Sequence, residues 1–418
     1  MGSADCRGAP CELDGPRPPA LAEIDHVLDL VNAVFSPEDR TMGLEFPQLF
    51  RRSNLHRLRL FVDPATGAPA AHAGYVAQKL VIEGCTVPVA ALGSVCTRPE
   101  YRGMGLASRL VQSIMKQAID EGLPLMMISG DLGVYKRLGA VEAGEFLRVE
   151  AQREQIRNLI EVMSERSGWA EANMRPAVRS DITEMASIYR REPVRYVRSV
   201  RDFEELTWWR PDMKRLYSTE SMWVAEAQDG CERAESVQAE GQQQSVAGSH
   251  AGARAGVGAG GSSMLGYVVA RKRKLDDGRT RLHVAEYAGA RWSVLLMVAR
   301  MCVEYGPDLL TFTMPASDRE MKALVRTARI PVRETTLPEY TIMSLNDEAL
   351  AACAGRAMAD REDAVGHAAR AAVWSGLRGP ELVRWIFGGS QVVNSGSELL
   401  PSHASGRLPL PVPGLNYI

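Results

Sequence analysis

Residues 94–107 read SVCTRPEYRGMGLA and decide the fold of this chain. An apolar stretch at residues 87–96 leads into the segment, and an amphipathic helical pattern follows it, so the segment joins a strand to a helix. The first amides of such a helix have no intrahelical partner, and the helix dipole adds positive potential. Gly103 and Gly105 lack a Cβ, which lets an anion approach the main chain closely. The segment therefore predicts an anion cradle suited to a pyrophosphate.

The surrounding elements predict a mixed α/β fold. The spacing of the glycines matches neither G-x-x-x-x-G-K-[ST] nor G-x-G-x-x-G, so the Walker and Rossmann mechanics do not apply. The apolar pattern predicts an amphipathic helix at residues 21–35 and further strands at residues 58–62, 71–82 and 124–129. Tight turns join the strands before the cradle into an antiparallel meander.

Two elements resemble the GCN5-related N-acetyltransferase (GNAT) superfamily. Residues 102–107, RGMGLA, fit that family's R/Q-x-x-G-x-G/A signature, and Tyr135 followed by Gly139 resembles its Y-x-x-x-G element. The order of helix, strands, cradle, helix, strand and tyrosine is the family's order over residues 21–150. The resemblance implies a catalytic domain that uses acetyl-CoA as its co-substrate.

The resemblance also implies the site residues. The pyrophosphate of acetyl-CoA would bind the cradle amides, and the pantetheine arm would lie along the preceding strand like an added edge strand. Tyr135 would act as a general acid that protonates the leaving thiolate. An ordinary helix start and a packed tyrosine ring are the alternatives without function. The cofactor-binding residues implied in this way are Val95, Cys96, Thr97, Arg102, Gly103, Met104, Gly105, Leu106 and Ala107.

The second half of the chain repeats the order of the first. A helix is predicted from residue 180, and a hairpin, a strand, a helix and a strand follow it. Residues 228–263 are rich in Gly, Ala, Ser, Gln and Glu, so they are expected to be a disordered insertion at the hairpin tip. At the position in the second half that corresponds to residues 102–107, the chain has only Gly289 and no R-x-x-G-x-A. We therefore expect a second, degenerate GNAT-like domain at residues 172–346.

Tandem domains of this kind, followed by a C-terminal segment, resemble the enhanced intracellular survival family of acetyltransferases. That resemblance implies that the terminal carboxylate, here on Ile418, enters the active site as a general base. A tail that only covers an apolar surface is the alternative. The expected organisation is a disordered tail at residues 1–20, a catalytic domain at 21–150, the second domain, and a C-terminal helical segment and tail at 347–418 that reaches the active site.

Composition limits the partners. The 418 residues include 49 Lys and Arg against 51 Asp and Glu, a formal net charge of −2, which disfavours nucleic acid and anionic membranes. The seven cysteines are scattered without a C-x-x-C pair, which indicates a reducing, cytoplasmic environment. The seven histidines include no close pair at ligand spacing, so no metal is expected. A homo-oligomer is one of the assemblies open to the chain.

These patterns together favour an N-acetyltransferase that moves acetyl from acetyl-CoA to a primary amine by direct attack. The favoured acceptor is a small molecule, either an amino sugar, an aminoglycoside-like compound or an amino-acid derivative, in a pocket walled by the second domain and the tail. A protein-lysine acetyltransferase with an open groove is one alternative. A non-catalytic acyl-CoA-binding sensor is the other.

Overall fold

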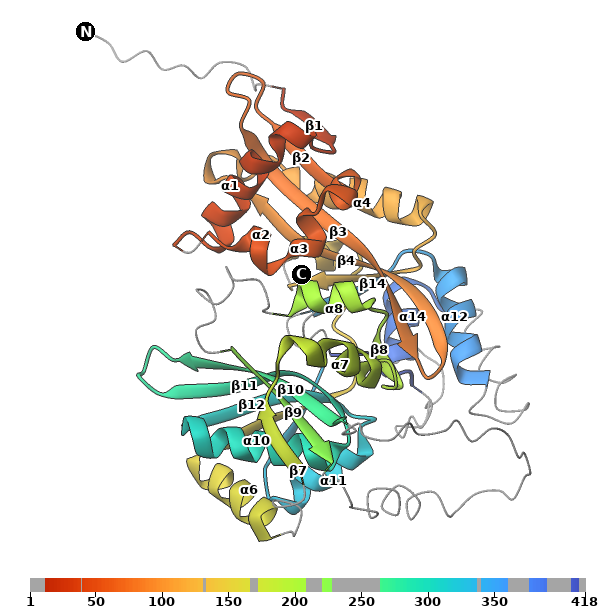
Figure 1. Cartoon of the computed structure of the whole chain (residues 1–418). Coiled ribbons are helices and arrows are strands. Elements are labelled where there is room, and N and C mark those ends of the chain that lie inside the picture. Colours follow the sequence, from red (N-terminus) through yellow and green to blue (C-terminus); the bar gives the residue numbers. More distant parts are fainter. Residues whose placement is uncertain are drawn as a thin grey trace.

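The computed structural model of the chain contains two mixed β-sheets, which confirms the mixed α/β fold predicted from the sequence (Figure 1). In Figure 1 the first sheet lies above the second, and α7 and α8 lie between them. The structure describes residues 12–38, 40–130, 133–165, 172–207, 220–227, 264–336, 340–359, 376–388 and 407–412.

The first sheet carries the meander and the cradle. β2, β3 and β4 pair antiparallel, whereas β4 and β5 pair in parallel and are connected through α4. Helices α1 to α3 pack on one face of this sheet and α4 packs on the other. The strands are β1 (Asp14–Arg17), β2 (Leu58–Val62), β3 (Pro69–Ile82), β4 (Cys85–Thr97), β5 (Leu125–Ser129), β8 (Val194–Tyr196) and β14 (Tyr340–Ser344); the helices are α1 (Ile24–Phe35), α2 (Met42–Glu45), α3 (Pro47–Phe50), α4 (Leu106–Asp120) and α5 (Gly133–Arg137).

The second sheet repeats this arrangement. β9, β10 and β11 pair antiparallel, and β11 and β12 pair in parallel and are connected through α10. The predicted hairpin is therefore confirmed as β9 and β10, while its insertion, residues 228–263, lies outside the described residues. The strands are β6 (Phe146–Gln152), β7 (Ala172–Pro176), β9 (Glu220–Ala227), β10 (Met264–Lys274), β11 (Thr280–Gly289), β12 (Leu309–Pro315) and β13 (Val332–Thr335); the helices are α6 (Arg153–Glu165), α7 (Ile182–Tyr189), α8 (Val200–Leu206), α10 (Arg291–Tyr305) and α11 (Arg319–Thr327).

Each sheet is completed by a strand from the other half of the chain. β14, which ends the second half, pairs antiparallel with β5 in the first sheet. β6, which ends the first half, lies between β12 and β13 in the second sheet. The expected domain boundaries at residues 150 and 346 therefore do not follow the sheets, because the last strand of each half pairs within the sheet of the other.

The expected disordered tail at residues 1–20 is a second point where the structure differs. β1 is the edge strand and pairs with β2, so the sheet begins before the first helix. A Cβ added at Gly15 would lie 2.4 Å from the Leu60 carbonyl oxygen, so this close approach requires glycine. Edge pairing uses main-chain groups, and a composition poor in apolar residues gives no signal of it. Residues 1–11 lie outside the described residues.

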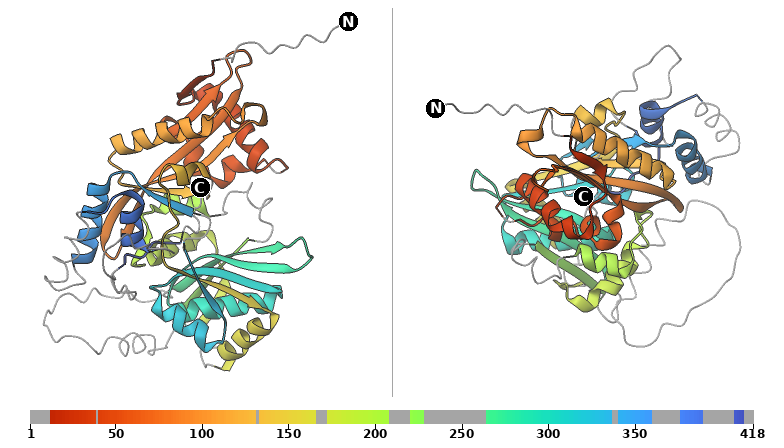
Figure 2. Two further views of the ribbon diagram at one scale, coloured as in Figure 1. Left: turned by 180° about the vertical axis from the view of Figure 1, so that it is seen from behind. Right: turned by 90° about the horizontal axis from the view of Figure 1, so that it is seen from above.

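The described parts of the C-terminal segment pack on the first sheet and contain no strand after β14. Helices α12 (Asp347–Ala359) and α14 (Gly379–Phe387) lie against β4 and β14 (Figure 2). The described part of the tail, residues 407–412, is docked between these elements. Leu408 and Leu410 are each 1% exposed in the same apolar cluster, and the Leu408 amide donates to the Ile386 carbonyl at 2.8 Å.

We predict that Leu410→Ala lowers the free energy of unfolding by about 2–5 kcal/mol, because the substitution leaves a cavity in a packed core. The measurement is denaturant unfolding of the purified full chain. An exposed tail leucine substituted in the same way would change stability by less than about 0.5 kcal/mol. A value that small for Leu410→Ala would show that the tail is not docked.

Candidate functional site

The parallel strands β4 and β5 part at the centre of the first sheet. Their pairing runs from Val89 opposite Leu125 to Leu92 opposite Ile128 and ends there. β4 continues to Thr97 and pairs along this last stretch only with β3. The predicted cofactor-binding residues Val95, Cys96 and Thr97 all lie on the part of β4 that has no pairing with β5.

A β-bulge lies in this unpaired part of β4. His72 of β3 is opposite Cys96, and Gly74 is opposite Gly93, so two residues of β4 face one residue of β3. The first of the two, Ser94, has φ +56°, in the left-handed region that a serine seldom adopts. The bulge bends β4 at the position where the strands part.

The cradle begins where β4 ends. Gly103 (φ +84°) and Gly105 (φ +72°) both have positive φ, and no atom lies within 4 Å of where their Cβ atoms would be. Gly105 is the N-cap of α4, and no side chain caps this helix. The main-chain amides of Gly103, Met104, Gly105, Leu106 and Ala107 make no hydrogen bond within the described part of the chain.

These observations fit a pyrophosphate-bearing cofactor. Unpartnered amides at a helix N-terminus attract an anion, and the open space above both glycines gives it access. Arg102 and Met104 are exposed beside this space. The residues predicted from the sequence as an anion cradle therefore have the geometry that such a site needs.

The cradle loop is fixed at its base by two contacts that the sequence did not reveal. The Tyr101 hydroxyl donates to Asp63 Oδ2 at 2.9 Å, across 38 residues of chain. The Arg98 Nε donates to the Pro69 carbonyl at 2.7 Å. Both partners belong to the turn between β2 and β3 or to its edge, so the position of the loop depends on the meander beside it.

Tyr135 lies on α5, on the same side of the sheet as α4. Its side chain is 2% exposed, and it shares one apolar cluster with Leu106 and Val95. The structure therefore brings together the tyrosine, the cradle and the unpaired part of β4. Burial raises the pKa of Tyr135 to about 12, and the nearby Cys96 adds to this shift. The phenol consequently keeps its proton at neutral pH.

Cys96 is a thiol that cannot serve as a nucleophile at neutral pH. Its side chain is 5% exposed, and burial raises its pKa to about 12. The thiolate is the reactive form of cysteine, and this form is absent at such a pKa. Covalent transfer through Cys96 is therefore disfavoured.

Ile418, the predicted general base, lies outside the described residues. The nearest described residues are Pro411 and Val412, which line a cavity of about 270 Å³ beside the second sheet. Six extended residues span at most about 20 Å, which sets the reach of the terminal carboxylate from Val412.

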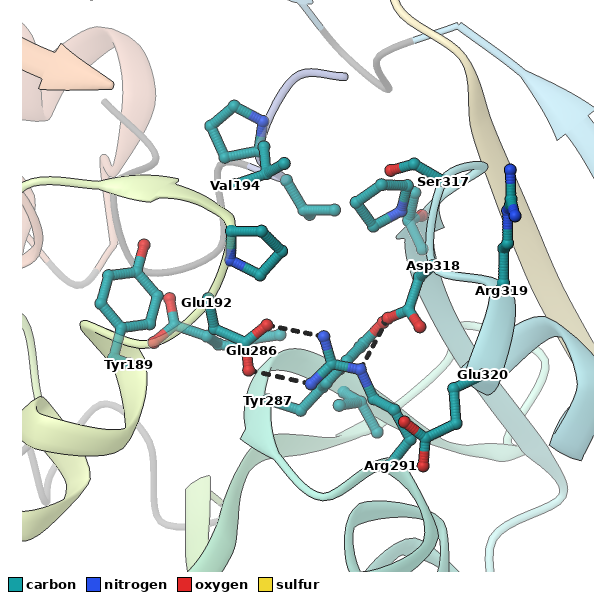
Figure 3. A pocket seen from close by; sticks show the side chains of 17 residues that line it. Tyr189, Glu192, Val194, Glu286, Tyr287, Arg291, Ser317, Asp318, Arg319 and Glu320 are labelled. Atoms are coloured by element: carbon teal, nitrogen blue, oxygen red, sulfur yellow. Dashed lines mark hydrogen bonds and ion pairs between the residues drawn. The ribbon is translucent and has the colours of Figure 1, made fainter. Parts of the chain in front are cut away.

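At the position that corresponds to the cradle, the second half contains charged side chains in place of free main-chain amides (Figure 3). β11 and β12 also part, after Val284 and Phe312, and the cavity of about 270 Å³ lies there. The Gly289 amide donates to the Glu192 carboxylate at 2.9 Å, which fills the position of a free cradle amide. Arg291, the first residue of α10, binds both Glu192 and Asp318.

This arrangement disfavours an anion in the second half. Four carboxylates, those of Glu192, Glu286, Asp318 and Glu320, line the cavity, against the two guanidinium groups of Arg291 and Arg319. A pyrophosphate placed there would meet more negative than positive side chains, and the amide of Gly289 already donates to Glu192. The start of α10 is thus occupied by the polar side chains of Glu192, Arg291 and Asp318, which accounts for the missing glycine signature.

Two other kinds of feature are absent from the described residues. No three His, Cys, Asp or Glu side chains gather there as a metal site. None of the helices in the described ranges is long and apolar enough to span a membrane.

Residues 16–142 match the family model of the acetyltransferase (GNAT) domain. No curated protein matches the chain significantly.

Several solved structures share the fold over most of the chain. A GCN5-related N-acetyltransferase from Anabaena variabilis ATCC 29413 has a TM-score of 0.52 and 14% identity, over 79% of this chain and 72% of that one. A probable N-acyltransferase from Enterococcus faecalis V583 has a TM-score of 0.53 and 13% identity, over 80% and 73%. Eis1 from Mycobacterium abscessus has a TM-score of 0.50 and 14% identity, over 81% and 75%.

At these identities the likeness shows the fold alone. It confirms that the resemblance to GNAT proteins extends beyond the first half. Eis1 is an enhanced intracellular survival acetyltransferase, so the resemblance to that family is confirmed at the level of the fold.

We predict that Gly105→Ala weakens the binding of coenzyme A at least about tenfold, a difference of about 1.4 kcal/mol. The added methyl group would occupy the open space above the cradle amides. The measurement is calorimetric titration, and the wild-type chain is expected to bind one equivalent because the second half has no free cradle.

Gly122→Ala is the matched control, because Gly122 also has positive φ (+74°) and open space but lies at the far end of α4. Both substitutions strain the backbone by about 1–2 kcal/mol. Equal losses of coenzyme A affinity in the two variants would contradict the cradle.

Proposed function

We propose that this chain, whose residues 16–142 belong to the GNAT acetyltransferases, transfers acetyl from acetyl-CoA to a primary amine of a small molecule. The observation that carries the proposal is the set of unpartnered amides at the start of α4, next to the parting of β4 and β5 and to the buried Tyr135. Acetyl-CoA supplies a thioester whose acetyl carbon the amine attacks.

The residues of this chain bind the cofactor, polarise the thioester and donate a proton. The cradle amides, from Gly103 to Ala107, bind the pyrophosphate and hold the pantetheine arm against β4. A main-chain amide of the unpaired part of β4 polarises the thioester oxygen. Holding both reactants in one place removes much of the entropic barrier. As the C–N bond forms and the C–S bond breaks, Tyr135 donates its proton to the departing sulfur.

Tyr135 holds the proton that the leaving thiolate needs. Burial raises the pKa of its phenol to about 12, so the group is protonated at neutral pH and can act as the acid.

A small acceptor is supported by how the second half covers the first. The start of α8 and the residues before it lie over the α3 face of β3. There the Gln48 side chain donates to Asp202 of α8 at 3.4 Å, and the Val197 amide donates to the Lys79 carbonyl at 2.8 Å. A cavity of about 210 Å³ remains between these elements. An acceptor lysine on a folded protein would need an open groove at this face.

The acceptor classes that fit are an amino sugar, an aminoglycoside-like compound and an amino-acid derivative. A panel of these amines, with polyamines and lysine peptides, distinguishes them by release of free thiol from acetyl-CoA. Release with lysine peptides alone would replace the proposal by a protein-lysine acetyltransferase. Cofactor binding without release on any amine would replace it by an acyl-CoA sensor.

We predict that Tyr135→Phe lowers kcat by about 10²-fold or more and leaves the affinity for acetyl-CoA unchanged. The ring and its packing are kept, and only the proton donor is lost. Thiol release at saturating amine gives kcat, and calorimetric titration gives the affinity. Full activity in Tyr135→Phe would remove the phenol from the mechanism.

We also propose that the carboxylate of Ile418 accepts the proton of the ammonium group, since a lysine-like amine has a pKa near 10.4 and must lose a proton before attack. We predict that deleting Tyr417 and Ile418 lowers kcat by about 10²-fold at neutral pH, and that the loss shrinks as the pH approaches the pKa of the amine. Unaltered turnover at neutral pH would assign the base elsewhere.

A further inference from the structure

His72 is a buried histidine next to β4, the strand along which the pantetheine arm would lie. It has no part in the mechanism above. It is on β3, directly opposite Cys96 of β4, at the register where the bulge begins. Its side chain is fully buried, and its ring stacks on Phe50 with 5.9 Å between the ring centroids. Burial lowers its pKa to about 4, so the imidazole is neutral at physiological pH.

One ring nitrogen of His72 holds the bulge. Nδ1 lies 2.9 Å from the Ser94 carbonyl oxygen and 3.4 Å from the Ser94 Oγ. A carbonyl oxygen can only accept a hydrogen bond, so Nδ1 must carry the proton of the neutral ring. The contact falls on the residue with φ +56°, and it therefore stabilises the left-handed conformation that makes the bulge.

This contact also fixes the direction of the next amide. The peptide between Ser94 and Val95 is planar and trans, so its C=O and N–H groups point in opposite directions. With the C=O held toward the His72 ring, the Val95 N–H points away from that ring. Val95 has no paired residue on β3 or on β5, and its side chain packs in the cluster that contains Tyr135.

The other ring nitrogen of His72 gives no stability. Nε2 is buried and has no hydrogen-bond partner among the described residues. A leucine or phenylalanine would fill an apolar site without leaving such an atom unsatisfied. The histidine is thus explained by what Nδ1 does at Ser94 and not by packing.

We propose that His72 is a positioning residue that clamps the Ser94 carbonyl and thereby directs the Val95 N–H toward the carbonyl oxygen of the bound acyl thioester. This inference rests on the proposed acetyl transfer, because it names the amide that polarises the thioester and the side chain that sets it. His72 itself touches neither substrate. It acts through one peptide of β4.

Substituting His72 by asparagine or by glutamine distinguishes the role of Nδ1 from the role of Nε2. In His72→Asn the side-chain nitrogen replaces Nδ1 and can still donate to Ser94, while nothing replaces Nε2. In His72→Gln the amide reaches the position of Nε2 and leaves Ser94 without its donor. His72→Leu provides neither group.

The expected result is that His72→Asn keeps kcat within about threefold, while His72→Gln and His72→Leu lose about 10²-fold in kcat with little change in KM for acetyl-CoA. The loss is of the size seen when one donor to a developing oxyanion is removed. Activity retained in His72→Gln and lost in His72→Asn would overturn the proposal, because Nε2 would then be the working atom. Equal losses in all three variants, in parallel with thermal stability, would overturn it as well.

The matched control is His283→Asn. His283 is a second neutral histidine, with Nδ1 3.0 Å from Thr311 Oγ1 in the second sheet, where no cradle exists. This variant is expected to keep both kcat and KM. A loss equal to that of His72→Leu would mean that any such histidine matters through stability alone, which would overturn the proposal.

A readout independent of turnover keeps this inference separate from the proposed function. In protein labelled with ¹⁵N-valine, the Val95 amide resonance is expected to shift in His72→Leu and to stay near its wild-type position in His72→Asn. If wild type released no thiol with any amine but this pattern held, acetyl transfer would fail and the clamp would stand. An unshifted Val95 resonance in His72→Leu would overturn the clamp whatever the activity.

Discussion

The exchange of β6 and β14 is the constraint on which the rest of this structure depends. Each half of the chain ends in a strand whose hydrogen-bond partners belong to the other half. Neither sheet is complete alone, so the halves cannot unfold independently without exposing unpaired strand edges. The same exchange holds the second half against the α3 face of β3, where the Gln48 side chain contacts Asp202. The fold and the acceptor site proposed above therefore depend on the same strand pairings.

The geometry of the loop before α4 could be predicted from the sequence because its signal is local. Gly103 and Gly105 must have positive φ, the helix start must follow at once, and both conditions are visible within six residues. The apolar periods likewise predicted β2 to β5 and the hairpin of β9 and β10. Such features are set by neighbours along the chain, and the structure confirms them.

The features that the sequence did not reveal are contacts between residues far apart in the chain. No periodicity indicates that residues 340–344 pair with β5, because an apolar strand has the same pattern wherever it pairs. The edge strand β1 consists of four residues without an apolar run. In the sequence, His72 is a single histidine with no second histidine at metal-ligand spacing. Its contact with Ser94 depends on the register of β3 and β4, and a bulge of one residue leaves no mark in composition.

The two halves share one backbone arrangement, but the helix start has free amides in one half and charged side chains in the other. Both contain a parallel strand pair that parts in front of a helix start. In the first half the helix amides are free, and in the second half Glu192 and Arg291 fill the corresponding place. The connectivity is that of a strand-swapped dimer whose two subunits have been joined into one polypeptide. Joining removes the requirement that both copies keep the same sequence, so the helix amides of one copy could stay free while a polar cluster filled the helix start of the other.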